Sequence, residues 1–177
     1  MNRQQFIKTI FEKRGNEVYA GEKVTQLEHA LQCAHFAELE TKDKDLILAA
    51  LLHDFGHIFH EEKELPNSLN QNLDDKHELN AYHWLKENIS EKVAELAKLH
   101  VAAKRFLCST DKNYFDKLSL ISQKSFNDQG GFMSKNELNN FESSPYKIEA
   151  IRLRKWDDKA KIPNLKTKQL KEYLVLL

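Results

Sequence analysis

Three histidines and an aspartate directly follow a run of hydrocarbon side chains in the segment LLHDFGHIFH, residues 51–60. Residues 46–52 are all Leu, Ile or Ala, so this run has no polar face and is expected to be buried together with His53 and Asp54. Burying a carboxylate beside an imidazole is costly unless hydrogen bonds or a cation compensate. The pair therefore predicts a bound metal, with a buried ion pair of no chemical role as the alternative.

Histidines also recur at a nearly constant interval, because His29, His53, His77 and His100 are 24, 24 and 23 residues apart. That interval fits one helix and one connection, so antiparallel helices could bring one histidine each to a common level of a bundle. Each histidine alone could equally be a satisfied core residue. Four imidazoles and two carboxylates exceed the needs of one tetrahedral metal and favour two metals bridged by a carboxylate.

One of those carboxylates is Asp54, and the other comes from the pair Asp157-Asp158. Asp157 shares a helical face with Leu153 and Ala150, which favours it as the inward residue. The sequence leaves the opposite assignment open, with Asp158 inward and Asp157 solvated.

The helices that would position these residues follow from apolar side chains recurring every three to four positions. Five glycines and three prolines, with no convincing strand, indicate an all-α fold in a single domain over residues 1–177. Helices are expected over residues 26–39, 45–54 and 77–88, and beginning at Ser90, Ser134 and Ser144-Pro145. Gly56 is expected to end or bend the second, residues 61–76 to form a surface loop, and residues 158–177 a polar tail with a short apolar end.

The charge balance limits the partners. Lys plus Arg and Asp plus Glu both number 27, so no basic field exists for nucleic acid or an anionic membrane, and a small molecule is expected. With no spanning apolar run and no secretory leader, the protein is expected to be cytoplasmic, and a monomer is expected. The two cysteines, Cys33 and Cys108, are expected to stay reduced, which leaves nitrogen and oxygen as metal ligands.

Six of these residues resemble the H...HD...D signature of the HD-domain superfamily, an all-helical metal-binding fold, together with the two extra histidines of its dinuclear members. They are His29, His53, Asp54, His77, His100 and Asp157. HD phosphohydrolases commonly read HDxGK, whereas this chain reads HDFGH, with His57 in place of the lysine. This departure points away from phosphohydrolysis.

The closer resemblance is to the HD-domain mixed-valence diiron oxygenases of the PhnZ type, over residues 19–161. Its distinctive stretches are YAGEKVTQLEHALQCA, ALLHDFGH, LHVAAKRFLC, QGGFMS and LRKWDDKAK. The resemblance implies two iron ions, Fe(II) and Fe(III), with dioxygen as co-substrate. It also implies cleavage of the carbon-phosphorus bond of 2-amino-1-hydroxyethylphosphonate to glycine and phosphate. The alternatives are a dinuclear phosphohydrolase for a nucleotide or phosphate ester, and a metal-stabilised binding module without turnover.

Two cations are candidates for binding the phosphonate. Lys104 lies one helical turn after His100, so both side chains could reach one cavity, although a lysine on such a stripe could simply extend to solvent. Arg154 lies three residues before Asp157 and could add a fork of donors, or could be a solvated charge.

The remaining substrate residues come from the resemblance. It implies that Ser122 and His57 are further phosphonate contacts, and that Tyr19 and Glu22 close over the site. It also implies that Glu22 pairs with the substrate's ammonium group. From the sequence alone, a surface tyrosine and glutamate would be the default.

Overall fold

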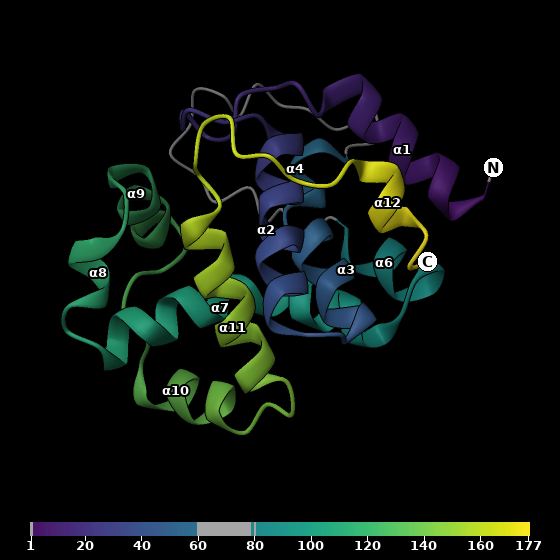
Figure 1. Cartoon of the computed structure of the whole chain (residues 1–177). Coiled ribbons are helices and arrows are strands. Elements are labelled where there is room, and N and C mark those ends of the chain that lie inside the picture. Colours follow the sequence, from purple (N-terminus) through teal and green to yellow (C-terminus); the bar gives the residue numbers. More distant parts are fainter. Residues whose placement is uncertain (1, 60–78, 80) are drawn as a thin grey trace.

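The computed structural model describes residues 2–59, 79 and 81–177, and this part of the chain is built from helices (Figure 1). The helices are α1 Arg3–Arg14, α2 Gln26–Glu40, α3 Lys44–Leu52, α4 Phe55–Ile58, α6 Tyr82–Asn88, α7 Glu91–Thr110, α8 Tyr114–Lys117, α9 Leu120–Asp128, α10 Lys135–Glu142, α11 Lys147–Lys159 and α12 Leu170–Leu174. Among the described residues, β pairing is limited to an isolated bridge between Val18 and Thr25. The predicted all-α fold is confirmed. No helix in these ranges is long and apolar enough to cross a membrane.

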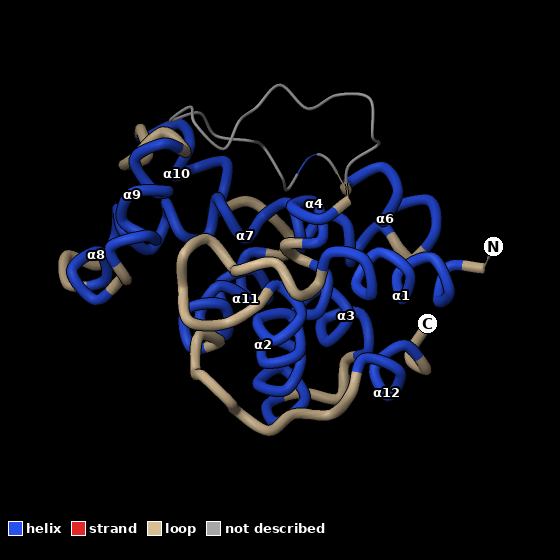
Figure 2. Tube along the Cα trace, turned by 90° about the horizontal axis from the view of Figure 1, so that it is seen from above, coloured by secondary structure: helices blue, strands red, loops and turns tan. Residues whose placement is uncertain are grey.

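The centre of the molecule is formed by α2, α3, α7 and α11, which pack against one another. In Figure 2, α8, α9 and α10 gather at one end, and α1 and α12 lie at the opposite end. Every residue from Leu46 to Leu52 is buried, so α3 is the core helix, as its unbroken apolar run predicted. At its start, the Asp43 carboxylate accepts hydrogen bonds from the N–H groups of Asp45 (3.1 Å) and Leu46 (3.3 Å).

Hydroxyl side chains cap the first turn of several other helices, among them α2, α7 and α10. Thr25 and Ser134 each form a reciprocal capping box with a glutamate three residues on, at the beginnings of α2 and α10. Ser90 accepts a hydrogen bond from the N–H of Val93 (3.2 Å) at the beginning of α7. The helix starts predicted at Ser90 and Ser134 are therefore confirmed.

The core helix ends earlier than predicted, and Gly56 does not end it. Helix α3 stops at Leu52, and Gly56 is a buried residue within α4. The imidazole of His53 contacts the Ala50 carbonyl through Nδ1 (3.0 Å), the carbonyl that the Asp54 N–H would use if the helix continued. Asp54 then leaves the helical region, with φ −100° and ψ 10°.

The ends of two other predicted elements also differ. Helix α11 begins at Lys147, because Ser144 and Pro145 form a turn in which the Lys147 N–H bonds to the Ser144 carbonyl (3.2 Å). The short apolar end of the predicted polar tail is partly helical, because it includes Tyr173 and Leu174 of α12, which are buried in the main core. The predicted loop 61–76 lies outside the described residues, as do residues 77, 78 and 80 of the helix predicted over 77–88; within that range the structure shows α6.

Candidate functional site

Five of the six predicted metal ligands lie together at the centre of the bundle. They come from α2, the turn after α3, α7 and α11, and each is at most 8% exposed. The metal cluster, as we call it, consists of His29, His53, Asp54, His100 and Asp157. His77, the sixth, lies outside the described residues.

Asp54 is the centre of this cluster, and its two oxygens face different histidines. Oδ2 lies 3.6 Å from Nε2 of His29 and 3.3 Å from Nε2 of His53. Oδ1 lies 3.3 Å from Nε2 of His100 and 3.9 Å from Nε2 of His57. A carboxylate that presents one oxygen to each of two nitrogen sets has the arrangement needed to bridge two metals.

The three imidazoles are fixed in the orientation that metal ligation requires. In each ring, Nδ1 contacts a backbone carbonyl: His29 with Ala160 (2.8 Å), His53 with Ala50 (3.0 Å) and His100 with Ala97 (2.5 Å). Because a carbonyl only accepts, Nδ1 carries a proton in each ring, which leaves Nε2 as the nitrogen that faces the cluster and would ligate a metal.

Asp157 faces inward, as the sequence favoured, and its two oxygens have separate surroundings. Arg154 Nη1 donates to Oδ2 (2.6 Å). Burial acts to raise the pKa of Asp157, but this guanidinium holds the pKa well below its usual range. Oδ1 is buried without a hydrogen-bond partner and lies 3.4 Å from Nε2 of His29. An ionised, unpartnered oxygen beside an imidazole lone pair fits a bound cation. These residues therefore suit bound metal ions.

Cys33 also borders the cluster, with Sγ 3.6 Å from Nε2 of His29. It lies near enough to His29 and His53 to form a three-residue group of potential ligands. Burial, together with Asp157 and Asp54, raises the pKa of the Cys33 thiol well above its usual value. The thiol is therefore neutral, which is consistent with a metal set of nitrogen and oxygen atoms.

Tyr19 covers the cluster from the loop before α2. Its ring stacks on His29, with centroids 3.8 Å apart and an interplanar angle of 12°. Its hydroxyl donates to Asp54 Oδ2 (2.7 Å), and burial together with Asp54 raises the pKa of Tyr19 well above its usual value. Predicted as a substrate residue, Tyr19 is held here by the metal cluster itself.

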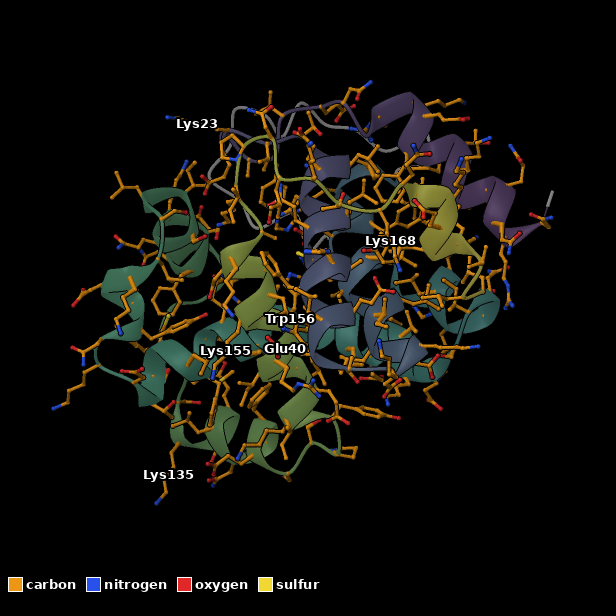
Figure 3. All side chains as sticks on the ribbon, in the orientation of Figure 1. Lys23, Glu40, Lys135, Lys155, Trp156 and Lys168 are labelled. Atoms are coloured by element: carbon orange, nitrogen blue, oxygen red, sulfur yellow. The ribbon has the colours of Figure 1, made fainter. Side chains whose placement is uncertain are left out.

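Lys104 lies one turn after His100 on α7 and is 3% exposed. It does not extend to solvent, unlike Lys23 and Lys135, which project away from the ribbon in Figure 3. Its ammonium donates to Ser125 Oγ (2.8 Å). Burial, and secondarily Arg154, lowers the pKa of Lys104 to about 8.

Helix α9, through Ser125, places Lys104 in a second group of polar side chains. Lys161, just after α11, donates to Ser122 Oγ (2.8 Å) and pairs with Glu22 (3.2 Å), while the Ser119 hydroxyl donates to Glu22 (2.7 Å). We call this group the lysine cluster; its members are Glu22, Lys104, Ser119, Ser122, Ser125 and Lys161. The sequence predicted Glu22, Lys104 and Ser122 as substrate residues but missed the other three.

Arg154 is buried, but its donors are occupied by the protein. The guanidinium bonds to Asp157, Asp158 and the Tyr114 hydroxyl, and that hydroxyl also bonds to Asp158. The structure therefore shows Arg154, which the sequence predicted as a phosphonate contact, holding Asp157 in position. Asp158 helps to hold Arg154.

A lysine-rich surface pocket of about 260 Å³ adjoins the lysine cluster. It is lined by Tyr114, Lys117, Leu118, Ser119, Lys155, Asp158, Lys159 and Lys161. Since Arg154 and Tyr114 already engage Asp158, the uncompensated charge around this pocket is positive, which suits the approach of an anion.

The comparisons with known proteins assign the family. The HD-domain family matches residues 27–128. The chain is 42% identical over 164 residues to hydroxymethylphosphonate dioxygenase of Gimesia maris, covering 93% of this chain and 81% of that protein. It is 37% identical over 163 residues to the glycine-betaine-forming [1-hydroxy-2-(trimethylamino)ethyl]phosphonate dioxygenase of Leisingera caerulea, covering 92% and 82%. An uncharacterised protein of Acanthamoeba polyphaga mimivirus is 34% identical over 169 residues, covering 95% and 77%. The chain therefore belongs to the HD-domain family and, within it, to the PhnZ-type oxygenases, which makes it an oxidoreductase.

Proposed function

We propose that this enzyme cleaves the carbon-phosphorus bond of a 1-hydroxyphosphonate with dioxygen, at a pair of iron ions, Fe(II) and Fe(III). The observation that carries the proposal is Asp54, whose two oxygens face separate histidines, beside the buried cation Lys104. The relatives' names supply the reaction type, because both are phosphonate dioxygenases.

The ligands proposed for the iron pair are the five residues of the metal cluster together with His77. When bound, such a pair supplies the activation of dioxygen and lowers the pKa of a coordinated substrate hydroxyl. The protein's own part is to hold the Nε2 atoms of His29, His53 and His100 in place through backbone carbonyls. Arg154 keeps Asp157 ionised, and Tyr19 shields Asp54 from water.

The lysine cluster is proposed as the phosphonate end of the site. A buried ammonium with a depressed pKa is poorly compensated, so a phosphonate dianion that reaches Lys104 would restore its charge and tighten the contact. Ser122 would donate to the same group, and His57, whose Nε2 lies 3.9 Å from Asp54 Oδ1, would be a further phosphonate contact.

The reaction balances for each substituent on the hydroxylated carbon. One hydroxyphosphonate and one dioxygen give one phosphate and one carboxylic acid, because one oxygen atom goes to each fragment as the carbon-phosphorus bond breaks. The sequence predicted 2-amino-1-hydroxyethylphosphonate, which would give glycine. The two named relatives act on compounds with no nitrogen and with a trimethylated nitrogen, so the class common to all three is the 1-hydroxyphosphonates. The phosphohydrolase alternative loses its support, because both relatives are dioxygenases.

The test is metal analysis and electron paramagnetic resonance on protein purified without air, followed by turnover of the three hydroxyphosphonates. We expect two irons per chain, an antiferromagnetically coupled mixed-valence signal, and equal amounts of oxygen consumed and phosphate released. Phosphate release without oxygen consumption would overturn the proposal.

A further inference from the structure

The carboxylate of Glu22 is already engaged by a cation of the protein. Lys161 lies 3.2 Å from Glu22 Oε1, and the Ser119 hydroxyl donates to the same oxygen (2.7 Å). The side chains of Glu22 and Lys161 are only 16% and 14% exposed, so little water screens the pair.

The position of Lys161 is fixed from its backbone as well as from its side chain. The preceding carbonyl, of Ala160, contacts Nδ1 of His29 (2.8 Å). The following residue, Ile162, exchanges two hydrogen bonds with the Gln32 amide of α2 (2.9 and 3.0 Å). Lys161 is thus anchored on both sides to the helix that carries His29, and it is no free member of a polar tail.

Lys161 also reaches Ser122 Oγ (2.8 Å) while it contacts Glu22. Its ammonium can therefore attract a phosphonate at Ser122 without leaving the carboxylate. A second cation brought by the substrate to Glu22 would meet this ammonium within one shielded site, and like charges there repel.

We infer that Lys161 determines substrate choice by neutralising Glu22, so that the enzyme selects 1-hydroxyphosphonates without a cationic nitrogen. Hydroxymethylphosphonate is the simplest of these. This inference rests on the proposed function and replaces the aminated substrate predicted from the sequence.

The test compares hydroxymethylphosphonate with 2-amino-1-hydroxyethylphosphonate on iron-loaded protein, by phosphate release in air and by equilibrium binding without oxygen. For the natural chain we expect kcat/KM to favour the first compound by more than about tenfold. Lys161→Met removes the charge and keeps the length, and should shift the ratios of both kcat/KM and Kd toward the aminated compound by at least about tenfold. Lys161→Gln serves the same purpose if the methionine variant does not fold.

Two matched variants act as controls. Lys161→Arg keeps the charge and should keep the preference, and Lys135→Met removes an exposed lysine of α10 and should leave both ratios unchanged. A natural chain that prefers the aminated compound, or a Lys161→Met protein with unchanged ratios, would overturn the inference. If protein that holds two irons released phosphate from none of the hydroxyphosphonates, the proposed function would be overturned instead. The ratio of Kd values, measured without oxygen, would still test the role of Lys161.

Discussion

The metal cluster and the lysine cluster adjoin each other, yet their charges are compensated in different ways. In the metal cluster the protein supplies nearly every partner: backbone carbonyls hold three imidazoles, and Arg154 holds Asp157. In the lysine cluster, Lys104 has a serine hydroxyl as partner and a pKa lowered to about 8. The first is organised before any ligand arrives, whereas the second keeps a charge whose best partner is an anion.

This difference predicts opposite consequences for mutation. Removing a member of the metal cluster leaves an uncompensated buried charge or lone pair, so both metal binding and stability should suffer. Removing Lys104, the poorly compensated cation of the lysine cluster, should weaken substrate binding while stability is kept or gained.

The largest effect is expected for Asp157→Asn. The amide cannot supply an ionised Oδ1, so iron should fall from two per chain to one or none, and activity by at least about a hundredfold. Metal analysis and phosphate release measure both. Asp158→Asn is the matched control, since Asp158 faces Arg154 and Tyr114, and its protein should retain both irons. The reverse pattern would move the ligand to Asp158.

The next largest effect is expected for Arg154→Met, as a lower melting temperature of the metal-free protein. Breaking a buried pair from one side leaves the Asp157 carboxylate without its cation and should cost about 3 to 5 kcal/mol of unfolding free energy. Lys155→Met, an exposed change on the same helix, should cost almost nothing. If Arg154 contacted only the substrate, its loss would weaken binding and leave the melting temperature unchanged.

Much of the metal cluster could be predicted because its residues interrupt apolar patterns. His53 and Asp54 follow seven buried residues of α3, and Asp157 continues the buried face that includes Leu153. The lysine cluster was found only in part. Its signals lie in segments without periodicity: Ser119 precedes a short helix, and Lys161 lies two residues beyond the last residue of the final main helix. Their meeting depends on the chain turning back along α2 after Ala160, and no local pattern encodes that turn.

The lysine side of the comparison is tested by Lys104→Met. Phosphonate affinity should fall about ten- to a hundredfold, the equivalent of a charge-assisted contact of about 1.5 to 3 kcal/mol. Ligand-free stability at pH 7 should stay the same or rise, because a poorly compensated buried charge is removed. A large loss of stability would show that Lys104 belongs with the metal cluster in its energetics.

The same residue predicts a pH dependence of stability. In the folded chain the pKa of Lys104 is lowered to about 8 from its ordinary 10.5, so between these values the unfolded chain binds more protons. The free energy of unfolding should therefore rise with pH across this window, by at most about 3 to 4 kcal/mol. Chemical denaturation at pH 7.5 and 9.5 should show a smaller rise for Lys104→Met than for the natural chain.

The smallest effect is expected for Glu22→Gln, where two accounts of the lysine cluster diverge. If Glu22 receives a substrate ammonium, loss of its charge should lower activity on the aminated phosphonate well beyond tenfold and spare hydroxymethylphosphonate. If Glu22 instead neutralises Lys161, the amide oxygen still accepts from Ser119 and Lys161. Turnover of hydroxymethylphosphonate should then change by less than about fivefold, and the aminated compound should remain a poor substrate. Phosphate release from both compounds by one preparation of iron-loaded variant decides between these accounts, because only the first gives a large, substrate-dependent loss.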